Sequence, residues 1–170
     1  VMGLEAGPAM EAYPVTNRFQ GTLASKSGYR VASDTISVFL PKEEERLVVT
    51  YVEEQKKSAS LYASKKLEGR DRYGVFLDGN HPVVRIRTMA ESDRTLLLLK
   101  DSYANCFVPF LTAHFREIVL VDPRYYYGNV NTLMGEEEFT DILFLYNLNT
   151  FLEDDVLHFV LEESQEEPTK

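Results

Sequence analysis

Three apolar runs in the second half of the chain constrain its fold most strongly. They are TLLLLKDS (95–102), EIVLVDPR (117–124) and DILFLYNLN (141–149), and each ends in polar residues. Continuous apolar runs of this length are typical of parallel strands that are covered on both faces. The spacers between them, 103–116 and about 128–139, are long enough for helices, so the order indicates βαβ units with right-handed crossovers. We therefore predict an α/β fold with a mostly parallel central sheet, whose strands include 95–101, 117–122 and 141–147.

The first half of the chain carries weaker signals. Gly3, Gly7, Pro8 and Pro14 interrupt residues 1–20, which we interpret as a loop or the end of an earlier helix. We expect strands at 31–40 and 46–53, which join as a small β-hairpin near the N-terminus. We also expect one or two helical turns within 58–67 and a weaker fourth strand at 73–80.

Length and charge restrict the class of protein. The 170 residues suit one domain, which we place at 1–155, followed by an acidic tail at 156–170 that holds one short amphipathic helix. The net charge is −9, and residues 153–170 contain seven acidic residues and one basic residue. Because no basic stripe is present to neutralise phosphates, we expect no nucleic-acid partner.

Several site types are excluded by the absence of their motifs. The single cysteine, Cys106, rules out an internal disulfide and a cysteine-based zinc site. No His-x-x-x-His pair and no glycine-rich phosphate loop is present, so we expect neither a metal nor a cofactor. No apolar run approaches the roughly 20 residues that span a bilayer, and no signal peptide is visible. The oligomeric state stays open.

Polar residues follow all three apolar runs, and ligands of open α/β sheets bind beyond these strand ends. The candidates are Asp101 and Ser102, Arg124, and Asn147 with Asn149. A serine here can expose its hydroxyl as a nucleophile, or it can simply cap the following helix. The asparagines can donate to an oxyanion or form turns, and Arg124 can hold an anionic or sugar ligand or lie on the surface.

A serine nucleophile needs a base, usually a histidine that a carboxylate orients. The histidines are His81, His114 and His158, and none lies in an Asp-x-His or Asp-x-x-His pattern. His114 lies about 18 Å from Ser102 along a straight helix, at about 1.5 Å per residue. We favour structural roles for all three, with His81 the first choice if one of them is functional.

Several segments together resemble the bacterial DHHW family. They are LLKDSYANC (98–106) with PFL (109–111), VDPRY (121–125), TDIL (140–143) with YN (146–147), YGVFLDGNH (73–81), FQGTLASK (19–26) and SLY (60–62). The resemblance covers about residues 10–155. It implies the C-terminal part of an SGNH-hydrolase-like protein, related to alginate-type O-acetyltransferases, with a three-layer α/β sandwich.

The resemblance also implies a chemistry. Such proteins hydrolyse esters or transfer O-acetyl groups on bacterial cell-envelope or extracellular polysaccharides, with a serine nucleophile, a histidine base and an aspartate. Ser102 matches the nucleophile, Asn147 or Asn149 matches the oxyanion-hole asparagine, and Arg124 lies where a second-block residue is expected. The implied partner is a carbohydrate or acyl-ester substrate, and the implied location is extracytoplasmic.

One motif of that family is missing. The Asp-His-His-Trp sequence that names it supplies the aspartate and the histidine, and this chain contains no tryptophan. By the resemblance the motif would precede Val1, so we expect little or no esterase activity from these residues alone. The alternative is a non-catalytic member that binds a glycan or a protein in the same cleft.

Overall fold

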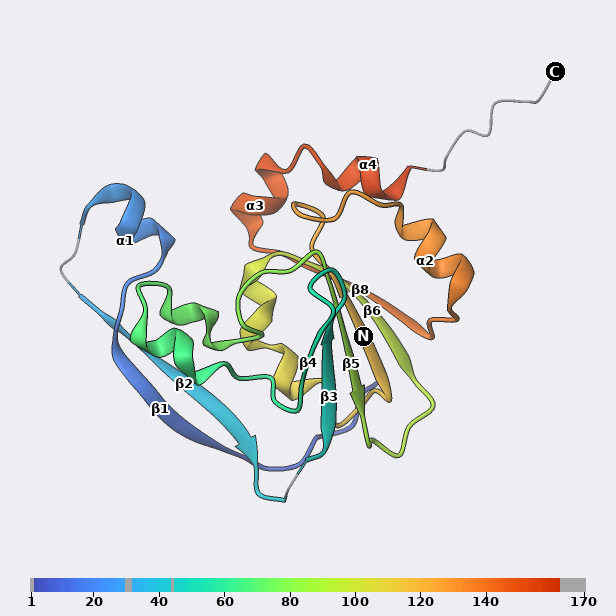
Figure 1. Cartoon of the computed structure of the whole chain (residues 1–170), viewed down its shortest axis with the longest axis horizontal. Helices are drawn as coiled ribbons and strands as arrows, with labels where there is room; N and C mark the ends of the chain where they lie inside the picture. Colours follow the sequence, from blue (N-terminus) through green and yellow to red (C-terminus); the bar gives the residue numbers. More distant parts are fainter. Residues whose placement is uncertain (1, 30–31, 44, 163–170) are drawn as a thin grey trace.

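The computed structural model describes residues 2–29, 32–43 and 45–162. Its centre is a six-stranded sheet in the order β4-β3-β5-β7-β6-β8 (Figure 1). The strands are β3 (Leu47–Tyr51), β4 (Lys56–Ser58), β5 (Val83–Thr88), β6 (Thr95–Lys100), β7 (Glu117–Val121) and β8 (Asp141–Leu145). The α/β class is confirmed.

The sheet is mixed, which corrects the prediction of a mostly parallel one. The three predicted strands, β7, β6 and β8, are adjacent and parallel, with Leu98 of β6 beside both Leu120 and Leu143. The other half is antiparallel: β5 pairs antiparallel with β7 and β3, and β3 with β4. A turn at 52–55 joins β3 and β4, and so short a connection permits only antiparallel pairing.

Residues 73–80 do not form the fourth parallel strand that we predicted. They begin within the 3₁₀ helix η2 (Arg72–Val75) and continue into a turn. Leu77, Asp78 and Gly79 have φ values of 57°, 61° and 111°, which no strand accommodates. Within 58–67, where we expected one or two helical turns, the 3₁₀ helix η1 (Ser64–Glu68) begins.

A small antiparallel hairpin lies near the N-terminus, as predicted, but its strands differ. It pairs β1 (Met10–Phe19) with β2 (Asp34–Pro41), and helix α1 (Thr22–Ser27) lies between them. The predicted pairing of 31–40 with 46–53 is therefore wrong. Of the loop expected at 1–20, residues 2–9 have no regular structure, as predicted, whereas 10–19 form β1. The register shifts between Pro14 and Thr16, and this irregularity lets the strand contain a proline that has no N–H to donate.

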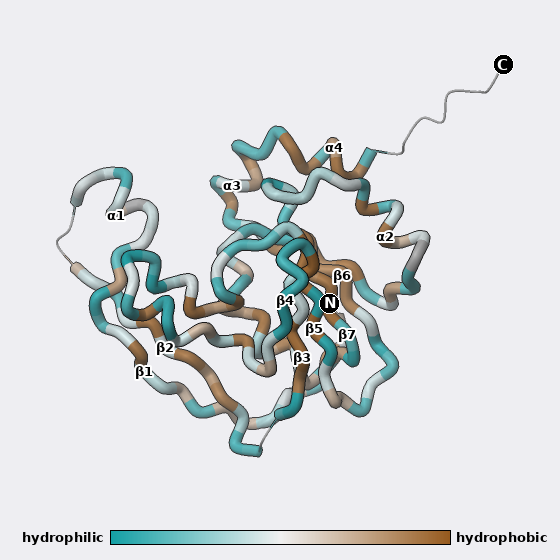
Figure 2. The backbone as a smooth tube through the Cα atoms, viewed as in Figure 1, coloured by the Kyte–Doolittle hydropathy of each residue, from teal (hydrophilic) through white to brown (hydrophobic). Residues whose placement is uncertain are grey.

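Both faces of the central strands β6 and β7 are buried. Leu96 and Leu98 of β6 point to one face, which residues 102–115 cover with Val108, Leu111 and Phe115. Leu97 and Leu99 point to the other face, where Val130 of α2 (Val130–Glu136) and Val160 of α4 (Leu157–Leu161) pack. Figure 2 shows the hydrophobic strands at the centre, surrounded by more hydrophilic loops.

The covering segments are less helical than predicted. The spacer 103–116 contains two short 3₁₀ helices, η3 (Ser102–Cys106) and η4 (Val108–Phe110), because Pro109 lacks the N–H that a continuous α-helix needs there. Helix α2 occupies the second spacer, and α3 (Leu148–Glu153) follows β8. Across the described ranges, every helix is too short or too polar to cross a bilayer.

Candidate functional site

The carboxyl ends of β6, β7 and β8 lie at the same edge of the sheet, because these three strands are parallel. Asp101 and Ser102 follow β6, Asp122 and Arg124 follow β7, and Asn147 follows β8. We call this the Ser102 edge. The structure thus places these candidates after neighbouring strands, and contacts between the strand ends define the geometry of the edge.

Asp101 joins two of the strand ends. It is the N-cap of η3, because its Oδ1 accepts a hydrogen bond from the Tyr103 N–H at 2.9 Å. Its Oδ2 accepts from the Asn147 N–H at 3.1 Å, which ties the end of β8 to the end of β6. The capping role that the sequence left open for Ser102 therefore belongs to Asp101.

Ser102 is the first residue of η3 and is partly exposed. Its hydroxyl makes no hydrogen bond to any residue in the described part of the chain, whereas its carbonyl oxygen accepts from the Tyr73 hydroxyl at 3.0 Å. Burial raises the pKa of Tyr73, so this hydroxyl stays a neutral donor. A hydrogen bond thus holds the backbone of Ser102, while its hydroxyl has no partner among the described residues.

A buried carboxylate fixes Arg124. The Asp122 side chain is fully buried and accepts two hydrogen bonds from Arg124, from Nε at 2.8 Å and from Nη2 at 2.6 Å. Both bonds raise the pKa of Arg124. The guanidinium also lies over the Tyr125 ring, 5.4 Å from its centroid. Arg124 is therefore a permanent, well-positioned cation that is partly open to solvent.

Lys100, the last residue of β6, is buried against the same carboxylate. Its Nζ lies 3.4 Å from Asp122 Oδ2. Burial lowers the pKa of Lys100, and the Asp122 charge opposes that effect. One carboxylate thus compensates the buried Lys100 side chain and orients the Arg124 guanidinium.

The two asparagines differ in position. Asn147 is the N-cap of α3, and its side-chain oxygen accepts from the Asn149 N–H at 2.9 Å. Its amide nitrogen is a separate donor, which this cap does not use. Asn149 lies in the first turn of α3 and is exposed. The edge therefore includes Asn147 directly, through its contact with Asp101, whereas Asn149 is linked to it through Asn147.

His81 has a carboxylate partner that the sequence reasoning missed. Its Nδ1 lies 2.6 Å from Glu54 Oε1, and its ring packs 4.5 Å from the Tyr51 ring. Burial raises the pKa of Glu54, but the hydrogen bond from His81 and a backbone hydrogen bond lower it below its usual value. The Nε2 atom of His81 is buried, with no hydrogen-bond partner among the described residues. Glu54 lies 27 positions away, so only the β3–β5 pairing could reveal it.

The loop that carries His81 contacts η3. Because β5 is antiparallel to β7, its first residues lie at the Ser102 edge, where the Asp122 N–H donates to the Pro82 carbonyl at 3.0 Å. Asn105 of η3 donates to the Gly79 carbonyl at 3.2 Å. Even so, no histidine side chain in the described part of the chain hydrogen-bonds to Ser102.

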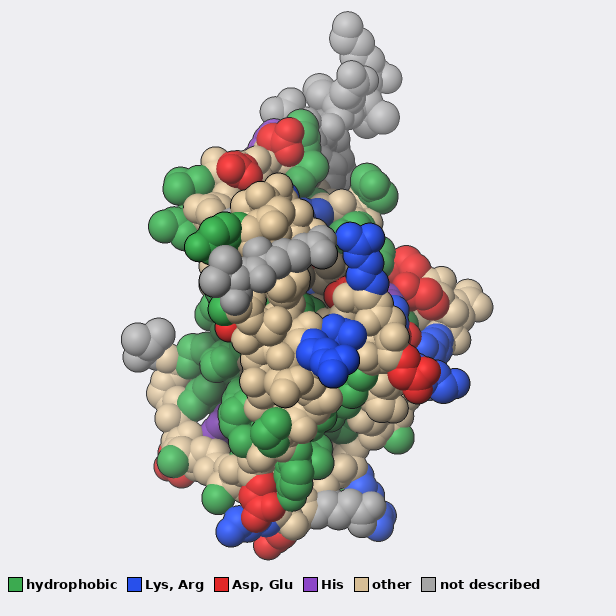
Figure 3. All heavy atoms as spheres, turned by 90° about the vertical axis from the view of Figure 1, so that its left-hand side faces the viewer, with side chains coloured by type: hydrophobic (Ala, Val, Ile, Leu, Met, Phe, Trp, Pro, Cys, Tyr) green, Lys and Arg blue, Asp and Glu red, His purple; other side chains and the backbone are tan. Residues whose placement is uncertain are grey.

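The other two histidines lie elsewhere. His158 is exposed on α4, and His114 lines a cavity of about 740 Å³ that Met10, Pro41, Met89 and Phe110 also line. This cavity lies beyond the opposite ends of the strands, and no residue of the Ser102 edge lines it. On the face that carries β1 and β2, hydrophobic side chains gather toward this end of the molecule (Figure 3). Among the described residues, no cluster of His, Cys, Asp and Glu could hold a metal ion.

Solved structures share this architecture, although no protein-family model and no curated protein matches the sequence. A DHHW family protein from Eubacterium siraeum DSM 15702 superposes over 91% of this chain and 54% of its own, with a TM-score of 0.72 and 23% identity. The chain shares the fold of a DHHW family protein. This finding agrees with the resemblance of the serine-bearing segments.

A second protein, Bacillus cereus PatB1, has the same fold. Its structure with a sulfonyl adduct matches with a TM-score of 0.63 and 19% identity, over 83% of this chain and 48% of PatB1. Another PatB1 structure matches with a TM-score of 0.60 and 18% identity, over 85% and 50%. The chain spans about half the length of each of these solved structures.

Proposed function

We propose that the Ser102 edge is the nucleophile-bearing part of an SGNH-type esterase or O-acyltransferase site, built on a three-layer α/β sandwich. The substrate class is acyl esters of bacterial cell-envelope or extracellular polysaccharide, and the location is extracytoplasmic. The observation that carries the proposal is the place of Ser102. It follows a buried parallel strand, its hydroxyl makes no hydrogen bond to a described residue, and Asp101 beside it holds the end of the next strand.

The proposed roles follow from the geometry. The Ser102 hydroxyl attacks the acyl carbonyl carbon, so a Ser102 O–C bond forms and the ester C–O bond to the sugar breaks. The serine proton passes through a base to the departing sugar oxygen, which leaves as a hydroxyl, and water or another sugar hydroxyl then takes the acyl group from Ser102. The Ser102 N–H and the Asn147 side-chain amide supply donors for the oxyanion. Arg124 binds an anionic or hydroxyl group of the sugar, because Asp122 holds its guanidinium in one orientation.

The comparisons support this chemistry at the level of fold. A sulfonyl adduct, such as the one in PatB1, is what a sulfonyl halide leaves on a nucleophilic side chain. The proton acceptor is the part of the site that these residues do not supply. By the DHHW resemblance, an Asp–His pair from outside residues 1–170 completes the site.

A second candidate function has an observation in its favour. No histidine hydrogen-bonds to Ser102 in the described ranges, whereas Arg124 and Tyr125 form a partly exposed cation–aromatic pair. Such a pair suits binding of a glycan or an acidic protein segment without catalysis. The two candidates differ in whether Ser102 ever carries an acyl group.

The experiment is an assay of the 170-residue chain on an activated acetyl ester, beside its Ser102→Ala and His81→Asn variants. We expect little or no turnover from any of the three, because a serine hydroxyl without a base loses several orders of magnitude in rate. Robust turnover that vanishes in Ser102→Ala would contradict the expectation that these 170 residues lack a base for Ser102. A parallel loss in His81→Asn would then identify His81, oriented by Glu54, as that base.

A longer polypeptide distinguishes the two functions. With an Asp-His-His-Trp segment ahead of these residues, the catalytic proposal predicts turnover that depends on Ser102. A longer polypeptide with that segment that stays inactive, yet retains glycan binding that Arg124→Ala abolishes, would favour the binding function.

A further inference from the structure

Two segments that lie far apart in the sequence meet at the backbone of Ser102. The Tyr73 hydroxyl of η2 donates to the Ser102 carbonyl at 3.0 Å and lies 3.3 Å from the Tyr103 carbonyl oxygen. In Figure 1 the green segment that contains η2 lies beside the yellow segment that contains η3. A side chain from the first half of the chain therefore holds the start of η3.

The peptide group that follows Ser102 is held at both of its polar atoms. Its carbonyl oxygen accepts from Tyr73, and its N–H, that of Tyr103, donates to Asp101 Oδ1 at 2.9 Å. Rotation of this peptide plane would break both hydrogen bonds. The Cα of Ser102 lies in the same plane, so the two bonds also hold the atom from which the serine side chain projects.

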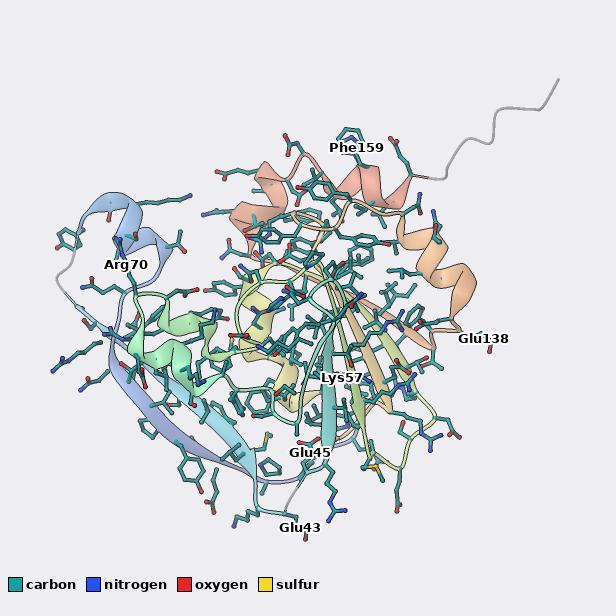
Figure 4. The ribbon with its side chains drawn as sticks, viewed as in Figure 1. Glu43, Glu45, Lys57, Arg70, Glu138 and Phe159 are labelled. Atoms are coloured by element: carbon teal, nitrogen blue, oxygen red, sulfur yellow. The ribbon has the colours of Figure 1, made fainter. Side chains whose placement is uncertain are left out.

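Aromatic packing in turn holds Tyr73. Its ring stacks on the Phe19 ring, with the centroids 5.9 Å apart, and lies 5.2 Å from the Phe76 ring. Burial raises the pKa of Tyr73, so its hydroxyl keeps the proton that it donates. Figure 4 shows that Arg70, in the loop between η1 and η2, extends away from the central sheet. Tyr73, rather than this cation, is thus the contact with η3.

The turn that follows η2 holds the other end of η3. Asn105 is 1% exposed and donates from Nδ2 to the Gly79 carbonyl at 3.2 Å. Leu77 and Asp78 in this turn have positive φ values, which residues other than glycine rarely adopt. An ion pair with Lys56 at 2.6 Å holds Asp78 in place. Backbone of this kind persists only where its surroundings fix it, and it occurs most often at functional sites.

We propose that Tyr73 is a positioning residue for the Ser102 nucleophile, within a frame of residues 73–79 that holds both ends of η3. Tyr73 acts through the Ser102 carbonyl, which leaves the serine hydroxyl without a partner in the described part of the chain. Displacement of a reacting atom by about 1 Å can cost about 100-fold in rate, so a held backbone favours attack. This role rests on the proposed chemistry of Ser102, whereas the contacts join described residues of this chain alone.

Hydrogen exchange tests the contact without using serine chemistry. Tyr73→Phe removes the hydroxyl and keeps the ring. Tyr62→Phe is the matched control, because Tyr62 packs in the same aromatic cluster and its hydroxyl also donates to a distant carbonyl, that of Phe39 at 2.6 Å. We expect amides of 102–107 to exchange faster in Tyr73→Phe only, and amides of 34–41 to exchange faster in Tyr62→Phe. Unchanged exchange at 102–107 in Tyr73→Phe, or an equal increase there in both variants, would overturn the proposal.

The rate at which phenylmethylsulfonyl fluoride modifies Ser102 tests the role itself. We expect Tyr73→Phe to lower this rate about three- to tenfold, as the loss of one hydrogen bond implies, and Tyr62→Phe to leave it unchanged. Tyr73→Leu removes the ring as well. If Tyr73→Phe reacts as fast as the unsubstituted chain while Tyr73→Leu is slow, packing alone matters and the proposal is wrong.

The two measurements separate this proposal from the proposed function. An unsubstituted chain that is never modified at Ser102 would overturn the nucleophile and, with it, the positioning role. Faster exchange at 102–107 in Tyr73→Phe would then still show that Tyr73 holds η3. Modification of Ser102 at equal rates in the unsubstituted chain and in Tyr73→Phe would instead overturn the positioning role and leave the nucleophile intact.

Discussion

The Asp122 carboxylate compensates two cations at the Ser102 edge, although Asp122 was not among the site residues predicted from the sequence. Its fully buried carboxylate faces both Lys100 and Arg124. Removing its charge leaves the buried Lys100 with only the smaller effect of the Asp101 charge, and breaking a buried pair in this way typically costs about 3–5 kcal/mol.

We therefore predict that Asp122→Asn lowers the free energy of unfolding, measured in urea, by about 3 kcal/mol or more. Lys100→Met should cost much less, because the Asp122 carboxylate keeps Arg124 as its partner. Asp93→Asn, which removes an exposed pair with Arg116, is the control, and it should change stability by less than about 1 kcal/mol. Equal decreases in the free energy of unfolding for Asp122→Asn and Asp93→Asn would show that the buried cluster of Lys100, Asp122 and Arg124 does not stabilise the fold.

Single residues also show how far the sequence could predict the site. Ser102, Arg124 and Asn147 could be placed together because each follows an apolar run, and parallel strands bring such positions to one edge. The cap could not be assigned, because Asp101 and Ser102 are both good N-cap residues and only the Tyr103 contact decides between them. The Glu54–His81 pair depends on the pairing of β3 with β5, which no local pattern specifies.

At the scale of elements, α4 is part of the core although it lies in the segment that we assigned to an acidic tail. Val160 is 4% exposed and packs with Leu97 and Val121 on the sheet. Its neighbour Phe159 is 62% exposed. The two adjacent residues of one helix therefore provide a matched pair of positions.

We predict that Val160→Asp destabilises the protein by about 1–3 kcal/mol, because the buried charge detaches α4 from the sheet. Phe159→Asp should change stability by less than about 0.5 kcal/mol, since this side chain already faces water. Thermal unfolding of both variants checks the difference. Equal effects would mean that α4 is not docked in solution.

Elements differed in how well their patterns predicted them. The parallel strands were clear because burial on both faces leaves an unbroken apolar run, as in Leu96–Leu99. Strand β1 was not predicted, because a proline such as Pro14 usually interrupts a strand. The register shift between Pro14 and Thr16 in the pairing of β1 with β2 accommodates this proline. Residues 73–80 have strand-like composition, but the positive φ of Leu77 and Asp78 makes them a turn.

At the scale of the whole molecule, ion pairs make stability depend on pH. Hydrogen bonds from Arg94 lower the pKa of Asp141. Burial raises the pKa of Asp78, but Lys56 and Lys66 outweigh it and the net pKa is lowered. A carboxyl group with a depressed folded-state pKa contributes stability that is present above its unfolded pKa, near 3.9 for Asp, and lost as pH falls through the folded value.

We therefore predict that the free energy of unfolding is nearly constant from pH 7 to about pH 5 and falls below about pH 4. Asp141→Asn should be less stable than the unmodified chain at pH 7 and should lose less between pH 4.5 and 3, since it has no carboxylate to protonate there. Urea titrations at one protein concentration across this range provide the measurement. A stability that rises on acidification would contradict the assigned direction of these pKa shifts.

The central claim is that Ser102 is the nucleophile, and its reactivity is the most direct test. The chain is treated with phenylmethylsulfonyl fluoride and digested with trypsin, and the modified positions are read by mass spectrometry. The peptide 101–116 contains Ser102 as its only serine. Positioning and oxyanion donors retain part of the rate advantage without a base, so we predict modification at Ser102 before exposed Ser25 or Ser60, with Ser102→Ala unmodified in this peptide. Modification of exposed serines while Ser102 stays unmodified would contradict the account.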